Sequence, residues 1–250
     1  MNPMITKGVS AKTILSKSKV FDYTINPYIG CEHGCTYCYA RFMKRFTGHK
    51  ERWGEFVDVK INAASLLQRE ITRKRVGRVW VSGMCDAYQP IEKKYELTRR
   101  CLEILLKQCW PVTIQTKSPL VSRDIELLKQ FKDVEVGLTI TTADENLRKI
   151  FEPNSSPIRE RIQTVEKLHS VGIKTFVMIA PMLPKAEGLA ARLRGKVDYV
   201  LIDKMNYHYA DWVYRKHKLE YAMSENFLSS MKRELAAAFK RERMRCQFLF

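Results

Sequence analysis

Three cysteines within eight residues constrain this chain more than any other feature. Cys31, Cys35 and Cys38 stand in the stretch Gly-Cys-Glu-His-Gly-Cys-Thr-Tyr-Cys-Tyr, with the spacing Cys-x3-Cys-x2-Cys. Three thiolates on one tight loop can bind three corners of a cubic iron–sulfur cluster, because thiolates are the usual protein ligands of such clusters. No fourth cysteine lies nearby in the sequence, so one iron would be left to bind a small molecule directly.

Two other interpretations of the cysteines compete with a cluster. A disulfide framework is disfavoured because the seven cysteines are odd in number, sparse, and preceded by no secretory segment. A zinc site made of the three cysteines and His33 is the stronger alternative, because zinc takes four such ligands tetrahedrally. However, the sequence has no second Cys/His pair, and His33 lies between the first two cysteines, where reaching the same ion is awkward.

The length and composition fit one globular domain. A chain of 250 residues that is 45% hydrophobic and 28% charged can bury a barrel-sized core. No apolar run is long enough for a membrane span, and residues 1–20 lack the apolar region of a secretory signal. We therefore expect a single domain over residues 1–250, a cytoplasmic location and no membrane partner.

The charge of the chain is strongly positive. Lysine and arginine number 44 against 27 aspartate and glutamate residues, which gives a net charge of +17. Such an excess favours polyanionic partners, nucleic acid above all, because binding releases condensed counterions. The basic residues are dispersed along the chain rather than gathered in one stripe. DNA or RNA is therefore a candidate partner, and a merely solvated basic surface is the alternative.

Strand-like and helix-like segments alternate along the chain. Apolar, β-branched runs predict strands at residues 23–28, 78–82, 111–116, 134–139, 173–179 and 197–202. Helical spacing lies between them: Leu97, Cys101, Ile104 and Leu105 share one face of 96–108, and Ile162, Val165, Glu166 and His169 share one face of 159–171.

Six βα units imply a parallel sheet with right-handed crossovers. Six units rather than eight predict an α/β fold that is a partial (β/α)6 TIM-like barrel, with the chemistry at the C-terminal ends of its strands. We expect its core over about residues 21–203. A basic helix at about 224–245 should follow, burying Met231, Leu235 and Ala238, and residues 246–250 should add a final strand.

Five further sequence blocks follow one another in order along the chain. They are Asn26-Pro-Tyr-Ile-Gly-Cys31 with Cys38-Tyr-Ala-Arg41, Ser82-Gly-Met-Cys-Asp-Ala-Tyr-Gln-Pro-Ile-Glu92, Thr116-Lys-Ser-Pro119, Thr139-Ile-Thr-Thr-Ala-Asp144 with Phe151-Glu-Pro-Asn-Ser-Ser-Pro157, and Ile179-Ala-Pro-Met-Leu-Pro184. Together with the cysteine motif, these blocks resemble the radical S-adenosylmethionine (SAM) superfamily. The resemblance is closest to its spore photoproduct lyase branch and that branch's short relatives labelled DNA repair photolyase-like, and it runs from about Phe21 to Asp203.

This resemblance implies two cofactors and a reductant. A 4Fe–4S cluster on Cys31, Cys35 and Cys38 would chelate the amino and carboxylate groups of SAM through its open iron. A flavodoxin- or ferredoxin-like electron donor would reduce the cluster. Cleavage of SAM would then give methionine and a 5′-deoxyadenosyl radical, which abstracts a hydrogen atom from the substrate.

The resemblance also assigns SAM contacts to named residues. Lys117 would face the SAM carboxylate, and the Thr139 hydroxyl would contact the same zwitterion. Asp86 would accept from the SAM amino group or a neighbouring donor, the Ala180 backbone would contact the adenine, and Tyr37 would pack near it. Each position also has an ordinary structural explanation, such as a solvated lysine, a strand threonine or an aromatic residue of the core.

Three residues are candidates for moving a hydrogen atom during catalysis. In the lyase, tyrosines placed like Tyr37 and Tyr39 are associated with a relay, and a cysteine returns a hydrogen atom to the product radical. Alignment of the acidic residue of this block with Asp86 puts Gly83 where that cysteine belongs, and Cys85 stands two residues further on. Cys85 is therefore a displaced donor or a buried cysteine that only packs, and thymine-dimer reversal is disfavoured.

We therefore expect a radical SAM enzyme whose substrate is a nucleic acid, in a DNA repair-like reaction. The first alternative is a radical SAM enzyme that acts on a small molecule or a protein side chain, with an incidental basic surface. The second is a zinc-binding nucleic-acid module without catalysis, which requires bound zinc and no iron.

Overall fold

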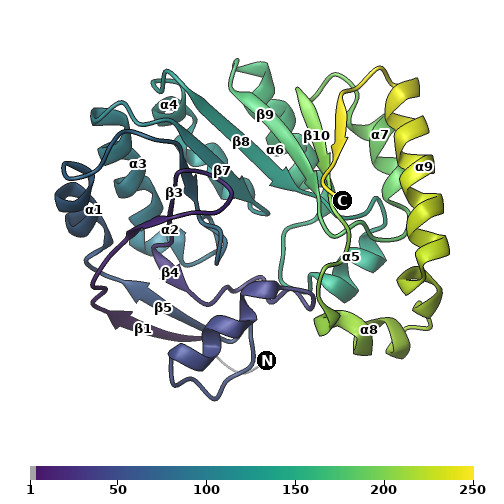
Figure 1. The fold of residues 1–250 in the computed structure, drawn as a ribbon, viewed down its shortest axis with the longest axis horizontal. Coiled ribbons are helices and arrows are strands. Elements are labelled where there is room, and N and C mark those ends of the chain that lie inside the picture. Colours follow the sequence, from purple (N-terminus) through teal and green to yellow (C-terminus); the bar gives the residue numbers. More distant parts are fainter. Residues whose placement is uncertain (1–3) are drawn as a thin grey trace.

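A mostly parallel sheet of eight strands forms the centre of the protein in a computed structural model that describes residues 4–250 (Figure 1). The antiparallel edge strand is β2 (Leu15–Lys17), which pairs with β3. The others run parallel in the spatial order β3 (Tyr23–Ile25), β6 (Val79–Val81), β7 (Val112–Thr116), β8 (Val134–Thr139), β9 (Lys174–Ile179), β10 (Tyr199–Ile202) and β11 (Cys246–Phe248).

This order confirms the predicted partial barrel, because each parallel strand lies beside the next one along the chain. The final strand is also confirmed. The first predicted strand, at 23–28, is wrong in its second half: β3 ends at Ile25, and Tyr28–Ile29 forms β4 in a different sheet. Pro27 lies between the two, and a proline cannot donate a hydrogen bond to a sheet ladder.

Helices line the sheet between successive strands, and Figure 1 shows α1 and α3 near one end of the sheet and α7 and α9 at the other. The α-helices are α1 (Ala63–Ile71), α2 (Glu92–Tyr95), α3 (Leu97–Lys107), α4 (Ile125–Leu128), α5 (Glu145–Phe151), α6 (Ile158–Ser170), α7 (Leu189–Leu193), α8 (Asp211–Lys216) and α9 (Glu225–Arg241). Short 3-10 helices are η1 (Tyr39–Phe46), η2 (Pro119–Asp124), η3 (Ala186–Gly188), η4 (His208–Ala210) and η5 (Glu220–Met223). No helix formed by residues 4–250 has both the length and the apolar character that a membrane crossing requires.

The predicted helix faces are confirmed for α3 and corrected in part for α6. Leu97, Cys101 and Leu105 are buried on α3, and Ile104 packs against the same core. On α6, Ile162 and Val165 are buried as predicted, and His169 is half-buried. Glu166, however, is exposed and pairs with Lys196, while Leu168 takes the buried position.

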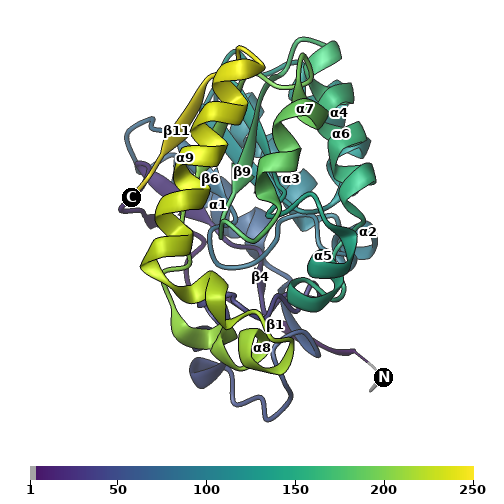
Figure 2. The same ribbon diagram turned by 90° about the vertical axis from the view of Figure 1, so that its right-hand side faces the viewer.

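The C-terminal helix α9 is present but ends four residues earlier than predicted. It starts after Ser224, whose hydroxyl accepts a hydrogen bond from the Phe227 N–H at 3.2 Å and caps the helix. Met231 and Leu235 are buried as predicted, and their i, i+4 spacing continues to Phe239 rather than to the half-buried Ala238. Figure 2 shows α9 running along this end of the molecule, with α8 beyond its N-terminal end.

A second sheet, absent from the sequence prediction, lies beside the first. Its order is β1 (Ile5–Val9), β5 (Phe56–Lys60) and β4, with β1 parallel to β5. It approaches the cysteine loop closely: a Cβ atom at Gly30 would lie 2.3 Å from the Phe56 carbonyl oxygen, and the φ of Gly30 is +89°. Only glycine fits this position, so the residue before Cys31 fixes the loop against β5.

Candidate functional site

One cavity of about 430 Å³ opens where the parallel strands end. We call it the site cavity. The chain passes from β3 through β4 into the cysteine loop. Residues that directly follow β6, β7, β9 and β10 line the cavity together with the last residue of β8. Every residue singled out by the sequence lines it: Cys31, Cys35, Tyr37, Cys38, Tyr39, Cys85, Asp86, Lys117, Thr139 and Ala180.

The cysteine loop is held in place from two sides by distant residues. The side-chain amide of Gln89 accepts a hydrogen bond from the Glu32 N–H at 2.9 Å and donates one to the Gly30 carbonyl at 3.3 Å. On the other side, Asn154 donates from its backbone to the His33 carbonyl at 3.3 Å and from its side chain to the Glu32 carbonyl at 3.0 Å. These bonds give a structural role to two of the sequence blocks, those around Gln89 and Asn154.

The three thiols of the loop suit a metal cluster. All three are free cysteines, and Cys31 and Cys35 are buried. Burial raises the pKa of the Cys35 thiol to about 12, and burial also raises the pKa of Cys31 well above its ordinary value. Such thiols are neutral on their own and become stable thiolates when bound iron supplies positive charge, so the donor set fits an iron–sulfur cluster.

A zinc site that includes His33 does not match the geometry. A single zinc ion needs four ligands that converge on one point. Over residues 4–250, no three His, Cys, Asp or Glu side chains are placed to hold a metal ion in this way. A cubic cluster instead binds each cysteine through a different iron. His33 is buried and faces Asp86, with 3.2 Å between Nε2 and Oδ2.

Asp86 ties the ends of β6 and β7 together. Its carboxylate accepts hydrogen bonds from the Thr116 hydroxyl at 2.5 Å, the Lys117 N–H at 2.7 Å and the Tyr88 N–H at 2.9 Å. Burial alone would raise the pKa of Asp86, but His33 and these hydrogen bonds hold it well below its usual range. The carboxylate therefore stays charged and is already satisfied by groups of the protein.

Lys117 brings a positive charge to the site cavity. Its Nζ lies 5.7 Å from the centroid of the Tyr37 ring. In the described part of the chain, this ammonium has no hydrogen-bond or ion-pair partner. Burial alone would lower the pKa of Lys117, but Cys35, Glu152 and Asp86 raise it above its ordinary value. A half-buried cation without a partner suits an anionic ligand group.

A buried ion pair that the sequence analysis missed supports Tyr37. The Tyr37 hydroxyl donates to Glu152, whose Oε2 lies 2.6 Å from a guanidinium nitrogen of Arg161; both charged side chains are fully buried. Arg161 also donates to the Thr139 carbonyl at 2.9 Å. A signal was present in the sequence, because Arg161 stands four residues before Val165, on the buried face of α6.

The fold brings a fourth cysteine to the site cavity, although none lies close in sequence. Cys85 packs against a group of buried side chains formed by Cys31, Ala40, Trp53 and Phe56. Its Sγ lies 2.8 Å from the Ser82 hydroxyl.

Position 83 has no room for a cysteine side chain. A Cβ atom there would lie 2.8 Å from the ring of Trp80, which itself lines the cavity. The carbonyl of Gly83 accepts a hydrogen bond from the Tyr39 hydroxyl. Because Trp80 occupies the space beside Gly83, the thiol of this segment is at position 85 and not at position 83.

Residues 203–207 line the cavity as well and were not singled out by the sequence analysis. They follow β10 just as the other site residues follow their strands. Their position after a parallel strand is the signal that could have placed this segment at the site.

Comparison with known proteins identifies a family and several uncharacterized relatives. The family model of the radical SAM superfamily matches residues 25–187. An uncharacterized protein of Methanocaldococcus jannaschii is 40% identical over 178 residues, covering 70% of this chain and 67% of the relative. An uncharacterized protein of Acidianus two-tailed virus is 32% identical over 171 residues, and one of Mycobacterium bovis is 30% identical over 195. The chain spans 56% and 57% of these two proteins.

Solved structures with similar folds include spore photoproduct lyase. The lyase complexed with dinucleoside spore photoproduct matches with a TM-score of 0.71 at 13% identity, covering 98% of this chain and 82% of the lyase. The SuiB protein of Streptococcus suis, bound to S-adenosylmethionine, matches with a TM-score of 0.58 at 16% identity, covering 91% of this chain and 50% of SuiB. At these identities the likeness is one of fold.

Proposed function

The chain belongs to the radical SAM superfamily and is an enzyme of that class, and on this premise we propose that Cys31, Cys35 and Cys38 hold a 4Fe–4S cluster beside SAM in the site cavity. One observation carries the proposal: the free thiols of the loop share a cavity with residues that follow β6, β7 and β9. When bound and reduced, the cluster would supply the electron that cleaves SAM and so generates a carbon radical for hydrogen abstraction.

The protein's own residues then bind and orient SAM. Lys117 is the cation for the carboxylate, because its ammonium lacks a partner in the described chain and stays charged. Thr139 offers a hydroxyl, which accepts from the Gln115 amide at 3.2 Å and can donate to the same ligand. The backbone at Ala180 takes the adenine, with Tyr37 beside Lys117 as a wall of the cavity. Asp86 acts by positioning Lys117, because its oxygens already accept from the Lys117 N–H, Thr116 and Tyr88.

Apolar side chains limit the access of water to the thiols. Ala40, Trp53 and Phe56 are buried against Cys31, and Cys38 and Cys85 pack against the same group. Exclusion of water strengthens electrostatic interactions inside a site and protects reactive intermediates. Tyr39 and Cys85 line the cavity with O–H and S–H groups, and they are the side chains we assign to returning a hydrogen atom.

Nucleic acid is the substrate class that we assign. The chain carries a net charge of +17, which favours a polyanion. A protein of similar fold, spore photoproduct lyase, has been solved with a dinucleoside. The reaction we propose is not thymine-dimer reversal with a hydrogen-donating cysteine at position 83. That position is Gly83, and Trp80 fills the space that a side chain there would need. A flavodoxin- or ferredoxin-like protein is the electron donor we expect.

Release of 5′-deoxyadenosine by reconstituted, dithionite-reduced protein tests the cofactor assignment. We expect Lys117→Ala to weaken SAM binding by about 10- to 100-fold, as expected for the loss of one hydrogen bond to a charged group. Lys129→Ala is the matched control, because Lys129 is an exposed lysine that pairs with Glu126. Equal SAM binding by the two variants, or no 5′-deoxyadenosine from the unaltered protein, would contradict the proposal.

A further inference from the structure

Three tyrosines form a ladder of stacked rings that leads out of the site cavity. Tyr39 and Tyr207 stack with their ring centroids 6.0 Å apart and their planes at 21°, and Tyr207 and Tyr209 stack at 6.0 Å and 14°. Tyr39 and Tyr207 line the cavity, whereas Tyr209 lies beyond its lining. All three are exposed, Tyr207 to 50%. Large apolar rings exposed in a row on one surface point to a binding partner.

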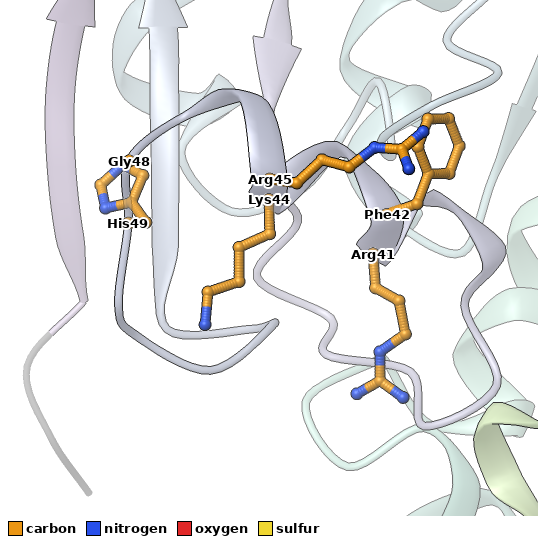
Figure 3. A pocket seen from close by; sticks show the side chains of 6 residues that line it. All are labelled: Arg41, Phe42, Lys44, Arg45, Gly48 and His49. Atoms are coloured by element: carbon orange, nitrogen blue, oxygen red, sulfur yellow. The ribbon is translucent and has the colours of Figure 1, made fainter.

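A basic surface adjoins this ladder. Figure 3 shows Arg41, Lys44 and Arg45 on η1, around one hollow, with Arg45 reaching along the ring of Phe42. The centroid of that ring lies 5.3 Å from the guanidinium carbon of Arg45. No acidic side chain in the described chain pairs with any of these three cations. Their charges are therefore available to an anionic partner.

Arg41 connects the ladder to the basic surface. Its guanidinium lies over the Tyr209 ring, 5.2 Å from the centroid, and it donates to the carbonyls of Thr36 and Tyr209 at 3.2 and 3.5 Å. Tyr39 is the first residue of η1 itself. One 3-10 helix therefore carries both the innermost ring of the ladder and the cations, so the two features form one continuous surface.

We propose that the ladder of Tyr39, Tyr207 and Tyr209 is a stacking platform that admits unpaired nucleotides to the site cavity, with Lys44 and Arg45 contacting their phosphates. This inference rests on the proposed function, whose substrate class it narrows from nucleic acid to single-stranded or locally unpaired nucleic acid. Aromatic rings beside a basic groove are the usual means of holding single strands, because every base has a π face. Bases within a duplex are already stacked and must be flipped out before they can reach such rings.

Fluorescence anisotropy with labelled oligonucleotides of about 12 nucleotides tests the platform. The probes are single-stranded DNA, RNA of the same sequence, and the DNA duplex, each added to anaerobically reconstituted protein. We expect either single strand to bind at least about fivefold more tightly than the duplex, the low end for one base–aromatic stack. Comparison of the affinities for single-stranded DNA and single-stranded RNA shows which of the two the protein prefers.

Two double variants test the rings themselves. Tyr207→Ala with Tyr209→Ala should weaken single-strand binding at least about fivefold, whereas Tyr207→Phe with Tyr209→Phe, which keeps both rings, should bind as the unaltered protein does. Tyr221→Ala is the matched control, because Tyr221 is 56% exposed but packs against Phe227 instead. Full binding by the alanine double variant, or loss of binding by the phenylalanine one, would overturn the platform.

The salt dependence tests the phosphate contacts. Between about 50 and 200 mM salt, Lys44→Ala with Arg45→Ala should reduce the slope of log affinity against log salt by about 1.4, or about 0.7 for each phosphate contact on a single strand. An unchanged slope would remove these two cations from the proposal.

The two proposals can fail separately. If the unaltered protein and Tyr221→Ala release 5′-deoxyadenosine from SAM but bind duplex as tightly as single strands, the platform is wrong and the cofactor assignment stands. If the unaltered protein binds single strands and cleaves no SAM, the proposed function is wrong.

Discussion

At the scale of single residues, the four cysteines of the site cavity fall into two groups: three on one loop, and Cys85 on a separate segment. Cys31, Cys35 and Cys38 lie on one loop that Gln89 and Asn154 hold in place from opposite sides. Cys85 comes from the segment after β6, and its Sγ contacts the Ser82 hydroxyl. We therefore assign the loop cysteines to the cluster and leave the thiol of Cys85 free to act in the cavity.

Replacement of Cys85 tests this division. We expect Cys85→Ala protein to reconstitute with about four irons per chain, as the unaltered protein does, because a three-cysteine site does not use this thiol. Iron and sulfide analysis after anaerobic reconstitution measures it. Cys101→Ala, a change of another buried cysteine outside the cavity, is the control. Loss of iron from the Cys85 variant alone would make Cys85 a ligand.

Gly83 is the residue whose replacement should disturb the cavity wall most directly. A methyl group at this position would meet the Trp80 ring at 2.8 Å, so Gly83→Ala should lower the free energy of unfolding by about 1–3 kcal/mol, the usual cost of overpacking. Urea unfolding measures this. Gly8→Ala, whose Cβ would meet only the Ile61 side chain at 3.3 Å, should have a smaller effect. Equal stability of the two variants would contradict the tight contact with Trp80.

Between elements, the buried pair of Glu152 and Arg161 joins the end of α5 to α6 and supports Tyr37 from the cysteine loop. Removal of one partner of a buried pair leaves an uncompensated charge. We expect Glu152→Ala to lower the free energy of unfolding by about 3–5 kcal/mol. Chemical denaturation measures it, with the exposed Glu160→Ala on α6 as the control. A loss no larger than that of the control would show that the pair has little effect on stability.

His49 links the segment after η1 to β5 and makes stability depend on pH. Its ring nitrogens lie 2.9 Å from Asp58 and from Glu51. Burial alone would lower the pKa of His49, but these carboxylates raise it above its ordinary value of 6.5. A group with a raised pKa in the folded state stabilises the protein fully below the unfolded pKa, and this stability is lost as pH rises through the folded pKa.

We therefore expect the difference in stability between the unaltered protein and His49→Gln to shrink as pH rises from about 6 to about 9. Thermal unfolding at a series of pH values measures the difference. The control is His217→Gln, which replaces an exposed histidine. A stability difference between the unaltered protein and His49→Gln that grows with pH would mean that the carboxylates do not stabilise a protonated His49.

At the scale of the whole molecule, the large sheet and most of the site cavity could be predicted from the sequence. The alternation of strands and helices is a local pattern, and the resemblance to the radical SAM superfamily assigned Asp86, Lys117, Thr139 and Ala180 to one site. Residues after successive parallel strands meet at the same edge of a sheet, which agrees with that assignment. The small sheet could not be predicted in this way. Its strands β1 and β5 pair although about 50 residues separate them, and their apolar residues show no clear alternation.

Long-range contacts account for the other omissions. The pairing of His33 with Asp86 and that of Tyr37 with Glu152 both join segments that lie far apart in the chain. Nothing in the local sequence identifies the partner of such a residue, because the two members of each pair come together only in the fold. The stacking of Tyr207 on Tyr39 likewise joins distant segments, so the row of tyrosine rings could not be predicted from the sequence.

The EPR signal of the reduced, reconstituted protein, recorded with and without SAM, tests the central claim most directly. The claim is that Cys31, Cys35 and Cys38 hold a cluster whose remaining iron binds SAM. It predicts about four irons per chain, a signal that shifts when SAM is added, and loss of both in Cys35→Ala. Bound zinc in place of iron, or a cluster signal that SAM leaves unchanged, would contradict it.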